Sequence, residues 1–369
     1  MVARCGGHRL AGFVPADGRV VHSLVHLHRR GQRGAHRLDR VAQLALGDDG
    51  RGVIKRSEEV LEVNVLERYR RDIEAARQRL VALDWRSVNT EFGTIEYVDR
   101  GEGPVVLVVH GITQAADGCL GDLAEELVPA GYRLLVPSRF GYLGSEMPEH
   151  ATPEMQADAF AGLLDALGID DAVVLAGSAG STSALHLGIR HPERVRALVL
   201  VSANVPGPHQ SRGMPPRRLF KAIFGNDPVL WAMITYLPDL MARLSQVLQV
   251  PEGVKLIPGD EEKLSRAMKN VLLGRRRVAG EVFDAYVSNP GVNAIDLSRV
   301  PTPTLVMHAR DDSGPPYASA VETARRIPDG RLVTVERGGH LMLGEHGDAI
   351  REVARFLAEH SPSAAEVQA

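Results

Sequence analysis

The chain has 369 residues, of which 44% are hydrophobic and 24% are charged, which is ordinary usage for a globular protein. Two cysteines exclude a disulfide framework and a multi-cysteine metal cluster, and a net charge of −3 gives no reason to expect nucleic-acid binding. No apolar run approaches the roughly 18 residues of a membrane span, and charges interrupt the first apolar stretch too early for a secretory signal. We therefore expect a cytoplasmic protein that engages neither a membrane nor nucleic acid.

The first 56 residues are strongly basic. They contain eleven Arg and Lys residues against four Asp residues, and no hydrophobic period is sustained in them. This composition predicts a disordered basic tail over residues 1–56. Two alternatives stay open for it: an arm that binds an acidic partner, and a metal site at His22, His26 and His28, which has no acidic or cysteine ligand nearby.

An amphipathic pattern follows the tail. Apolar residues recur at every third to fifth position from Val60 to Leu80, with charged residues between them. Ser57 and the two glutamates after it suit a helix start, because acidic side chains interact favourably with the positive end of a helix. The sequence predicts a helix over residues 57–84 that packs against the following domain and carries no chemistry.

From residue 85 the pattern changes to strands that alternate with helices. Alternating runs on either side of Gly93 predict an antiparallel hairpin, and the continuous apolar runs after it are typical of a parallel sheet covered by helices on both faces. We expect this α/β core to comprise residues 85–203 and 301–369. The predicted core strands are Val105–Val109, Arg133–Pro137, Ala172–Ala176, Val195–Ser202, Pro303–His308 and Arg331–Val335. The predicted core helices lie near Leu120–Pro129, Thr152–Leu167, Gly180–Arg190, Tyr317–Ile327 and Asp348–Glu359.

Residues 204–300 interrupt this alternation with a helical, apolar segment. Strands of one sheet flank the segment, and we expect both its ends to lie at the carboxyl edge of that sheet. Its apolar residues exceed what a surface hairpin needs, and we expect a helical cap that roofs a site and selects the substrate. Phe224 and Trp231 are the predicted pocket residues, with packing in the core of the cap as the alternative for each.

The first candidate for chemistry is a serine at the end of a strand. The sequence Gly177-Ser178-Ala179-Gly180 joins a predicted strand directly to a predicted helix. A serine on so tight a turn has its hydroxyl group forced outward, and small neighbours let the backbone double back. The amide of Ala179 would then point toward the group that the serine attacks. Helix capping and phosphate binding are alternatives for such a turn.

Three further loops follow the ends of predicted strands. Gly111 lets the first of these loops fold back, so that the amide of Ile112 can serve as a second oxyanion donor. Asp311 and Asp312 follow a later strand, and His340 follows the last one. The carboxyl ends of parallel strands meet at one edge, which is where open α/β sheets build their sites. We therefore expect a serine, an acid and a histidine to converge there.

These stretches resemble the α/β-hydrolase superfamily, specifically its capped serine-hydrolase, esterase-like branch. The resemblance covers about residues 87–360. It implies an α/β-hydrolase fold: a mostly parallel sheet with helices on both faces and a helical cap inserted before the acid-bearing strand. The matching stretches are Val108-Val109-His110-Gly111, Pro137–Ser145, Ala176–Gly180, His191-Pro192-Glu193-Arg194-Val195 and Gly338-Gly339-His340.

The resemblance assigns Ser178 as the nucleophile. The serine of the family lies thirteen residues before the His-Pro-Glu-Arg stretch, which begins here at His191, and this spacing argues against Ser181. Ala176 occupies the position of the first glycine in the usual motif, which is a departure from the family pattern.

The resemblance also assigns the other two members of a triad. The family's acid precedes a proline by four residues, which favours Asp312, with Pro316 after it, over Asp311. His340 becomes the general base.

These roles imply acyl transfer through a covalent intermediate. Ser178 would attack a carbonyl group after His340 takes its proton, while Asp312 orients the imidazole. The amides of Ile112 and Ala179 would hold the oxyanion. The expected reaction is hydrolysis of a carboxylic ester with a small to medium hydrophobic acyl or aromatic group, without a metal or an organic cofactor. The alternatives are hydrolysis of a carbon–carbon bond, thioester or lactone by the same triad, and a non-catalytic ligand-binding member of the fold. The expected partner is a small-molecule substrate, and a homodimer stays open.

Overall fold

The computed structural model describes residues 50–119, 126–207, 214–245 and 248–361. The chain divides into two compact units, residues 1–67 and residues 68–369. The first 49 residues of the predicted basic tail lie outside the described residues, as does most of the helix predicted near Leu120–Pro129. A short helix, α4 (Ala116–Cys119), precedes that gap.

The predicted N-terminal helix is present as α3 (Gly50–Val81). It begins before Ser57, within the range predicted as tail, because three Arg and Lys residues upstream are good helix formers and a local start signal does not prevent a helix from extending past it. Like every other described helix, α3 is not both long enough and apolar enough to cross a membrane. In the second unit its buried face packs against cap residues. The cluster comprises Ile73, Ala76, Leu80, Trp231, Leu272 and Leu273.

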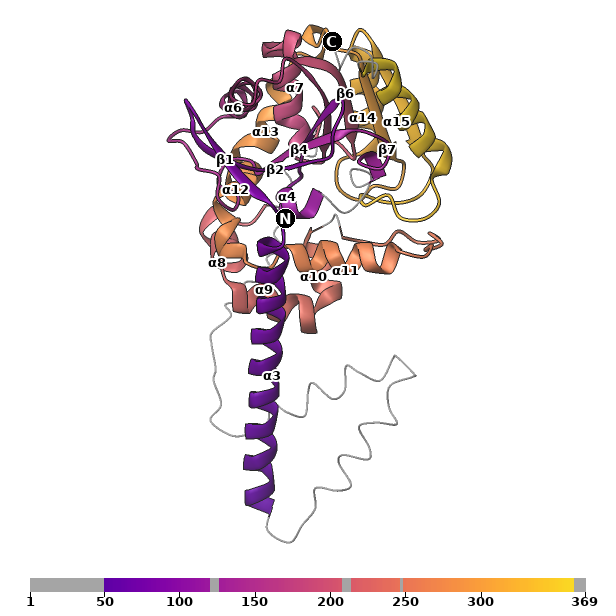
Figure 1. Ribbon diagram of the computed structural model, residues 1–369. Helices are drawn as coiled ribbons and strands as arrows, with labels where there is room; N and C mark the ends of the chain where they lie inside the picture. The colour runs from indigo at the N-terminus through magenta and orange to yellow at the C-terminus, as the bar shows by residue number, and fades with distance from the viewer. Residues whose placement is uncertain (1–49, 120–125, 208–213, 246–247, 362–369) are drawn as a thin grey trace, which may run out of the picture. The chain divides into compact units, whose positions relative to one another are not determined.

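The second unit is built around a sheet of eight strands in the order β1-β2-β4-β3-β5-β6-β7-β8 (Figure 1). The pairs β1–β2 and β2–β4 are antiparallel, and all other neighbours are parallel. The predicted hairpin and parallel sheet are confirmed, and each predicted core strand ends within one residue of its observed limits. The strands are β1 (Trp85–Thr90), β2 (Gly93–Arg100), β3 (Val105–Val109), β4 (Arg133–Pro137), β5 (Ala172–Gly177), β6 (Val195–Val201), β7 (Thr304–Ala309) and β8 (Gly330–Val335).

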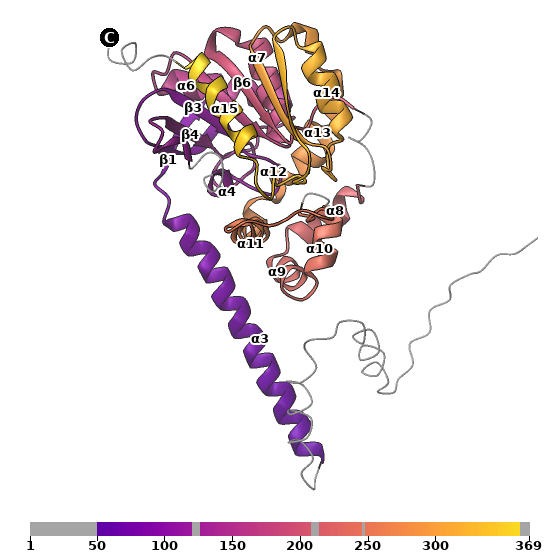
Figure 2. The same cartoon turned by 90° about the vertical axis from the view of Figure 1, so that its right-hand side faces the viewer.

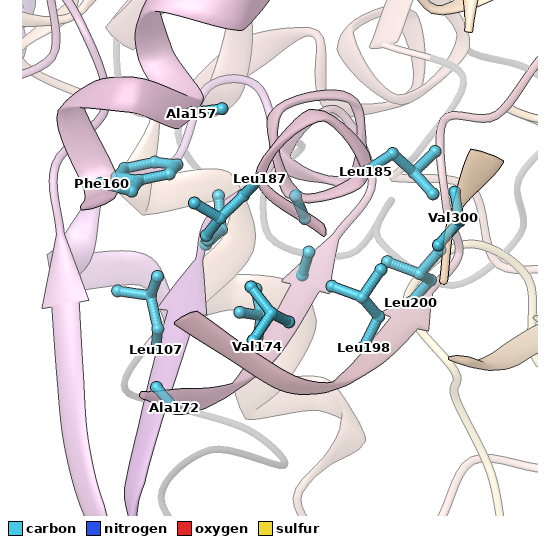
Figure 3. Packing of buried hydrophobic residues seen from close by; sticks show 14 of the residues in the cluster. Leu107, Ala157, Phe160, Ala172, Val174, Leu185, Leu187, Leu198, Leu200 and Val300 are labelled. Carbon is cyan, nitrogen blue, oxygen red and sulfur yellow. The ribbon is translucent and has the colours of Figure 1, made fainter. Parts of the chain in front are cut away.

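Helices cover both faces of this sheet. Alternate residues of a strand point to opposite faces, so Val174 of β5 packs with α6 and α7, whereas Val173 belongs to the cluster that includes α15 (Figure 3). The hydroxyl of Thr152 accepts a hydrogen bond from the Met155 amide at 3.2 Å and so caps the start of α6. The core helices are α6 (Pro153–Ala166), α7 (Gly180–Arg190), α14 (Tyr317–Arg326) and α15 (Gly347–His360).

A group of cap helices lies at the carboxyl edge of the sheet, on the side away from α6 and α7 (Figures 1 and 2). These helices are α8 (Arg217–Phe224), α9 (Asp227–Tyr236), α10 (Pro238–Ser245) and α11 (Asp260–Asn270).

The predicted cap of residues 204–300 extends too far at its C-terminal end. The expectation that both ends lie at the carboxyl edge is also wrong, because β6 and β7 are parallel and β7 begins at the opposite edge. Val292, Ile295, Leu297 and Val300 belong to the main core cluster, together with residues of the sheet, α6 and α7. Apolar residues at helical spacing predict a buried face, but they do not identify the neighbour that buries it. The short helices of this return segment are η2 (Gly274–Arg276), α12 (Val278–Phe283), η3 (Asp284–Ser288), α13 (Asn289–Gly291), η4 (Val292–Ala294) and η5 (Leu297–Arg299).

Candidate active site

Ser178 lies on the turn between β5 and α7. Its backbone has a conformation that residues other than glycine rarely adopt. Its φ angle is +49°. Such conformations cost of order 1–3 kcal/mol and persist only where neighbouring groups hold them. The amide of Ser178 donates to the Val201 carbonyl at 3.0 Å, and its carbonyl accepts from the Asn204 amide at 2.9 Å. Strand β6 and the segment after it therefore hold the strained turn in place.

Gly180 and Ala176 are small residues at this turn, and the space around each of them differs. A Cβ atom added at Gly180 would lie 2.6 Å from the carbonyl oxygens of Val109 and His110, so only glycine fits there. Ala176, which replaces the usual first glycine, is a regular and fully buried residue of β5, paired with Leu200. The extra methyl group thus lies in the sheet, and the departure from the family motif does not alter the turn.

The three residues predicted as a triad meet at the carboxyl edge of the sheet. His340 Nε2 lies 3.0 Å from Ser178 Oγ, and His340 Nδ1 lies 2.9 Å and 3.1 Å from the carboxylate oxygens of Asp312. The Asp312 side chain is fully buried and also accepts a 2.7 Å hydrogen bond from the Gly314 amide. A carboxylate beside Nδ1 keeps the proton of a neutral imidazole on that nitrogen, which leaves Nε2 to accept the serine proton.

Asp311, the neighbouring aspartate, binds backbone amides and not the histidine. The carboxylate of Asp311 accepts hydrogen bonds from the amides of Gly338 and Gly339, at 3.0 Å and 2.9 Å. These bonds tie the acid-bearing loop to the loop that ends at His340. The geometry thus places Asp312, and not Asp311, against the histidine.

The two aspartates are expected to respond differently to substitution. Asp312→Ala should lower kcat by about 10³-fold or more, because the imidazole loses the group that orients it. Asp311→Ala should mainly lower the melting temperature, since two hydrogen bonds to a charged group are lost. Steady-state kinetics and thermal unfolding of both variants check this, and a larger loss of kcat in Asp311→Ala would contradict the assignment.

The two predicted oxyanion donors flank the serine. Within the described residues, the amides of Ile112 and Ala179 have no hydrogen-bond partner. A Cβ atom added at Gly111 would lie 3.0 Å from Ser178 Cβ, so the Ile112 loop passes directly beside the serine. Two amides that are free to donate near the attacking oxygen suit stabilisation of an oxyanion.

His110 supports this loop, a role that the sequence did not reveal. Its buried ring accepts a hydrogen bond at Nε2 from the Arg139 amide at 2.9 Å, and Nδ1 lies 2.8 Å from the Gly111 carbonyl oxygen. Nε2 accepts, so the ring proton is on Nδ1 and is donated to Gly111. Burial, with Arg139 nearby, holds the pKa of His110 well below its usual range and keeps the ring neutral.

A cavity of about 500 Å³ opens above Ser178 and His340. Its size suits a small-molecule substrate. Val201, Met307, Leu341 and Met342 supply apolar surface from the core side. The cap contributes Leu248, Ile257, Asp260, Lys263, Arg266 and Ala267.

The predicted pocket residues Phe224 and Trp231 do not line this cavity. Phe224 stacks on Phe220 at a centroid distance of 4.3 Å, and Trp231 packs edge-on against Tyr69 while its Nε1 donates to Asp72 at 2.9 Å. The prediction is wrong because Phe224 packs against Phe220 within α8, and Trp231 of α9 packs against α3. The cavity wall comes instead from α11 and the segment before it.

Trp231 is therefore expected to affect stability and not selectivity. Trp231→Ala should destabilise the protein by about 3–5 kcal/mol, the usual loss for a large aromatic side chain removed from a core. Its relative kcat/KM values over a series of acyl lengths should stay unchanged. Urea unfolding and ester profiling measure the two effects, with Leu237→Ala, at a half-exposed position on the same cap, as the control. A change in acyl preference without a loss of stability would show that Trp231 contacts the substrate.

Comparison with known proteins agrees with the fold. The family model of the alpha/beta hydrolase fold matches residues 104–347. The chain is similar to a 2-hydroxymuconate semialdehyde hydrolase from Pseudomonas putida, with 29% identity over 71% of this chain and 89% of that protein. It is similar to a 2-hydroxy-6-oxo-6-phenylhexa-2,4-dienoate hydrolase from Burkholderia cepacia, with 27% identity over 70% and 90% of the two chains. An alpha/beta hydrolase fold protein from Nakamurella multipartita has a similar structure, with a TM-score of 0.61 and 29% identity over 74% and 99% of the two chains.

Proposed function

Because this chain belongs to the α/β hydrolase family, we propose that it hydrolyses the carbon–carbon bond beside the ketone of a 2-hydroxy-6-oxo-dienoate. The observation that carries hydrolysis is the placement of His340 Nε2 3.0 Å from Ser178 Oγ, with the buried carboxylate of Asp312 on the other ring nitrogen. The two hydrolases from Pseudomonas putida and Burkholderia cepacia are named for substrates of this class, and they favour the carbon–carbon alternative over the ester cleavage expected first from the sequence.

The reaction begins with conversion of the dienol into a 2-oxo acid. The 2-hydroxyl group loses its proton and carbon 5 gains one, so the 6-oxo group becomes an isolated ketone. Ser178 then adds to carbon 6 while His340 takes the hydroxyl proton, and the amides of Ile112 and Ala179 stabilise the resulting oxyanion.

Breakage of the bond between carbons 5 and 6 follows collapse of this oxyanion. The bonding electrons move onto carbon 5 and are delocalised through the adjacent double bond into the 2-oxo group, which gives a dienolate. His340 returns a proton to this leaving group and then activates a water molecule that hydrolyses the acyl-serine. Ester hydrolysis uses the same side chains, but it needs no ketonisation of the substrate and expels an alkoxide.

The composition of the cavity supports an acidic substrate with an apolar end. Lys263 and Arg266 of α11 place two cationic side chains on its wall, which also carries the carboxylates of Asp260 and Glu126, and a substrate carboxylate could bind to either cation. The carboxylate of the nearby Asp260 accepts hydrogen bonds from the amides of Ile257 and Gly344, at 2.8 Å and 2.9 Å. Leu341 and Met342 supply apolar surface for the substituent beside the ketone.

The test compares 2-hydroxy-6-oxo-6-phenylhexa-2,4-dienoate with neutral p-nitrophenyl butyrate. We expect kcat/KM for the dienoate to exceed that for the ester by roughly 100-fold. Lys263→Ala should raise KM for the dienoate by about tenfold and leave KM for the neutral ester unchanged, since only the acid carries a charge to bind. Turnover of the ester with none of the dienoate would restore ester hydrolysis as the function. Absence of both activities and of labelling by a fluorophosphonate would overturn serine hydrolysis altogether.

A further inference from the structure

A second buried histidine lies against the carboxylate of the triad. His308, the penultimate residue of β7, is fully buried. Its Nε2 lies 3.3 Å from Asp312 Oδ2 and 2.9 Å from the carbonyl oxygen of Pro315. His340 approaches the same carboxylate at 2.9 Å. The Asp312 carboxylate is therefore held between two imidazole rings.

The protonation of His308 follows from its partners. The Pro315 carbonyl can only accept a hydrogen bond, so Nε2 carries a proton and donates it. The other ring nitrogen, Nδ1, is buried without a partner among the described residues. A proton on that nitrogen would add a buried and unsatisfied charge, so the ring is neutral, with a proton on Nε2 alone.

The electrostatic surroundings agree with a neutral ring. Burial lowers the pKa of His308, and the nearby His340 lowers it further, whereas Asp312 and the bond to Pro315 oppose the shift. The phenol ring of Tyr317 on α14 packs at a centroid distance of 6.4 Å. Its N–H is donated to Pro315, so a neutral ring lies beside Asp312 and does not cancel the charge of the carboxylate. The full carboxylate charge stays available to His340.

Hydrogen bonds also hold the loop that runs from His308 through Asp312 to Pro315. The Asp312 amide donates to the Ala309 carbonyl at 3.3 Å, and the Gly314 amide donates to the Asp312 carboxylate at 2.7 Å. The bond from His308 to Pro315 fixes the far end of this loop. Together with the bonds from Gly338 and Gly339 to Asp311, it keeps the carboxylate in place against His340.

We propose that His308 is a positioning residue for the triad: it holds the Asp312 loop through its hydrogen bond to Pro315 and places a neutral ring beside the carboxylate, so that Asp312 stays against His340 Nδ1. This role rests on the proposed serine-hydrolase function. His308 does not touch the substrate cavity, so its effect must pass through Asp312 and His340.

Two substitutions separate this role from simple core packing. His308→Leu fills the space but cannot donate a hydrogen bond, whereas His308→Gln can place an amide N–H close to the position of Nε2. With p-nitrophenyl butyrate we expect His308→Leu to lower kcat by roughly 10- to 100-fold at unchanged KM, and His308→Gln to recover most of that loss. Titration of active sites with a fluorophosphonate counts the folded enzyme, so that loss of folded protein is not mistaken for loss of kcat.

The pH profile gives a readout that packing alone would not move. A carboxylate that drifts away from Nδ1 stabilises the His340 imidazolium less, so the acid limb of kcat/KM should move to lower pH in His308→Leu and stay in place in His308→Gln. Proton NMR of the Nδ1–H of His340 tests the same contact without catalysis. This resonance should lose its downfield position in the leucine variant only.

The outcomes distinguish the two proposals. An unchanged Nδ1–H resonance and an unchanged pH profile in His308→Leu would overturn the role of His308. A wild-type protein that neither hydrolyses the ester or the dienoate nor reacts with the fluorophosphonate would overturn serine hydrolysis. In that case a displaced resonance would still support the contact among His308, Asp312 and His340.

Discussion

Ser178→Ala is expected to lower hydrolysis by at least about 10³-fold while the protein folds as before. The substitution removes the atom that lies 3.0 Å from His340 Nε2 and little else. Alanine and serine bear the same cost at the left-handed φ of +49°, so the strained turn neither gains nor loses stability from the backbone. Initial rates with the dienoate and the ester, together with thermal unfolding, measure both expectations.

Ser181→Ala is the matched control. Ser181 lies in the first turn of α7, three residues away, and its fully buried hydroxyl has no hydrogen-bond partner within the described residues. Its amide donates to the Ser178 carbonyl, a bond that alanine preserves. The control should retain wild-type turnover. Loss of activity in Ser181→Ala, with activity retained in Ser178→Ala, would show that the nucleophile has been misassigned.

Glu281→Gln is expected to stabilise the protein increasingly as the pH rises from about 5 to about 8. Glu281 on α12 is fully buried, and both its carboxylate oxygens lack a partner among the described residues. Around it, Arg139 pairs with Asp284 at 2.5–2.6 Å, and Arg277 pairs with Asp117 at 2.6–3.0 Å. Two arginines are thus matched by two aspartates, and an ionised Glu281 would add an unmatched buried charge.

The sign of the effect follows from the proton balance. Burial, and to a lesser extent Asp284, raises the pKa of Glu281 from 4.5 to about 8, although Arg277 opposes the shift. Between these values the folded protein holds a proton that the unfolded chain has released. The free energy of unfolding therefore falls with rising pH by about 1.4 kcal/mol per pH unit from this group, and the contribution levels off above pH 8. Glutamine carries no titrating proton, so the variant lacks this slope.

Urea unfolding of the wild type and Glu281→Gln at pH 5, 6.5 and 8 measures the difference in free energy. Glu149→Gln, which makes the same chemical change at a side chain that is 90% exposed, is the control and should show no such trend. A difference between Glu281→Gln and the wild type that stays constant across this pH range would mean that Glu281 is ionised in the folded protein.

The sequence determined the elements and the identity of the converging loops. Strand periodicity predicted the parallel sheet, and α7 is observed over Gly180–Arg190 as predicted. Ser178 and His340 could be chosen because each follows the carboxyl end of a parallel strand, and such ends meet at one edge whatever the rest of the chain does. Local pattern and topology are both written along the chain, so this part of the site required no knowledge of packing.

Tertiary structure decided everything that depends on which surfaces meet. Asp311 and Asp312 are adjacent in the chain, and only the folded loop shows that one binds backbone amides while the other contacts His340. Trp231 is apolar in either environment, and its burial against α3 depends on a helix more than 150 residues away in sequence. The roles of His308 and Glu281 arise from buried neighbours brought together from separate elements. Hydrophobic burial and Coulomb interactions depend on distance in space, which sequence spacing does not specify beyond a single turn or strand.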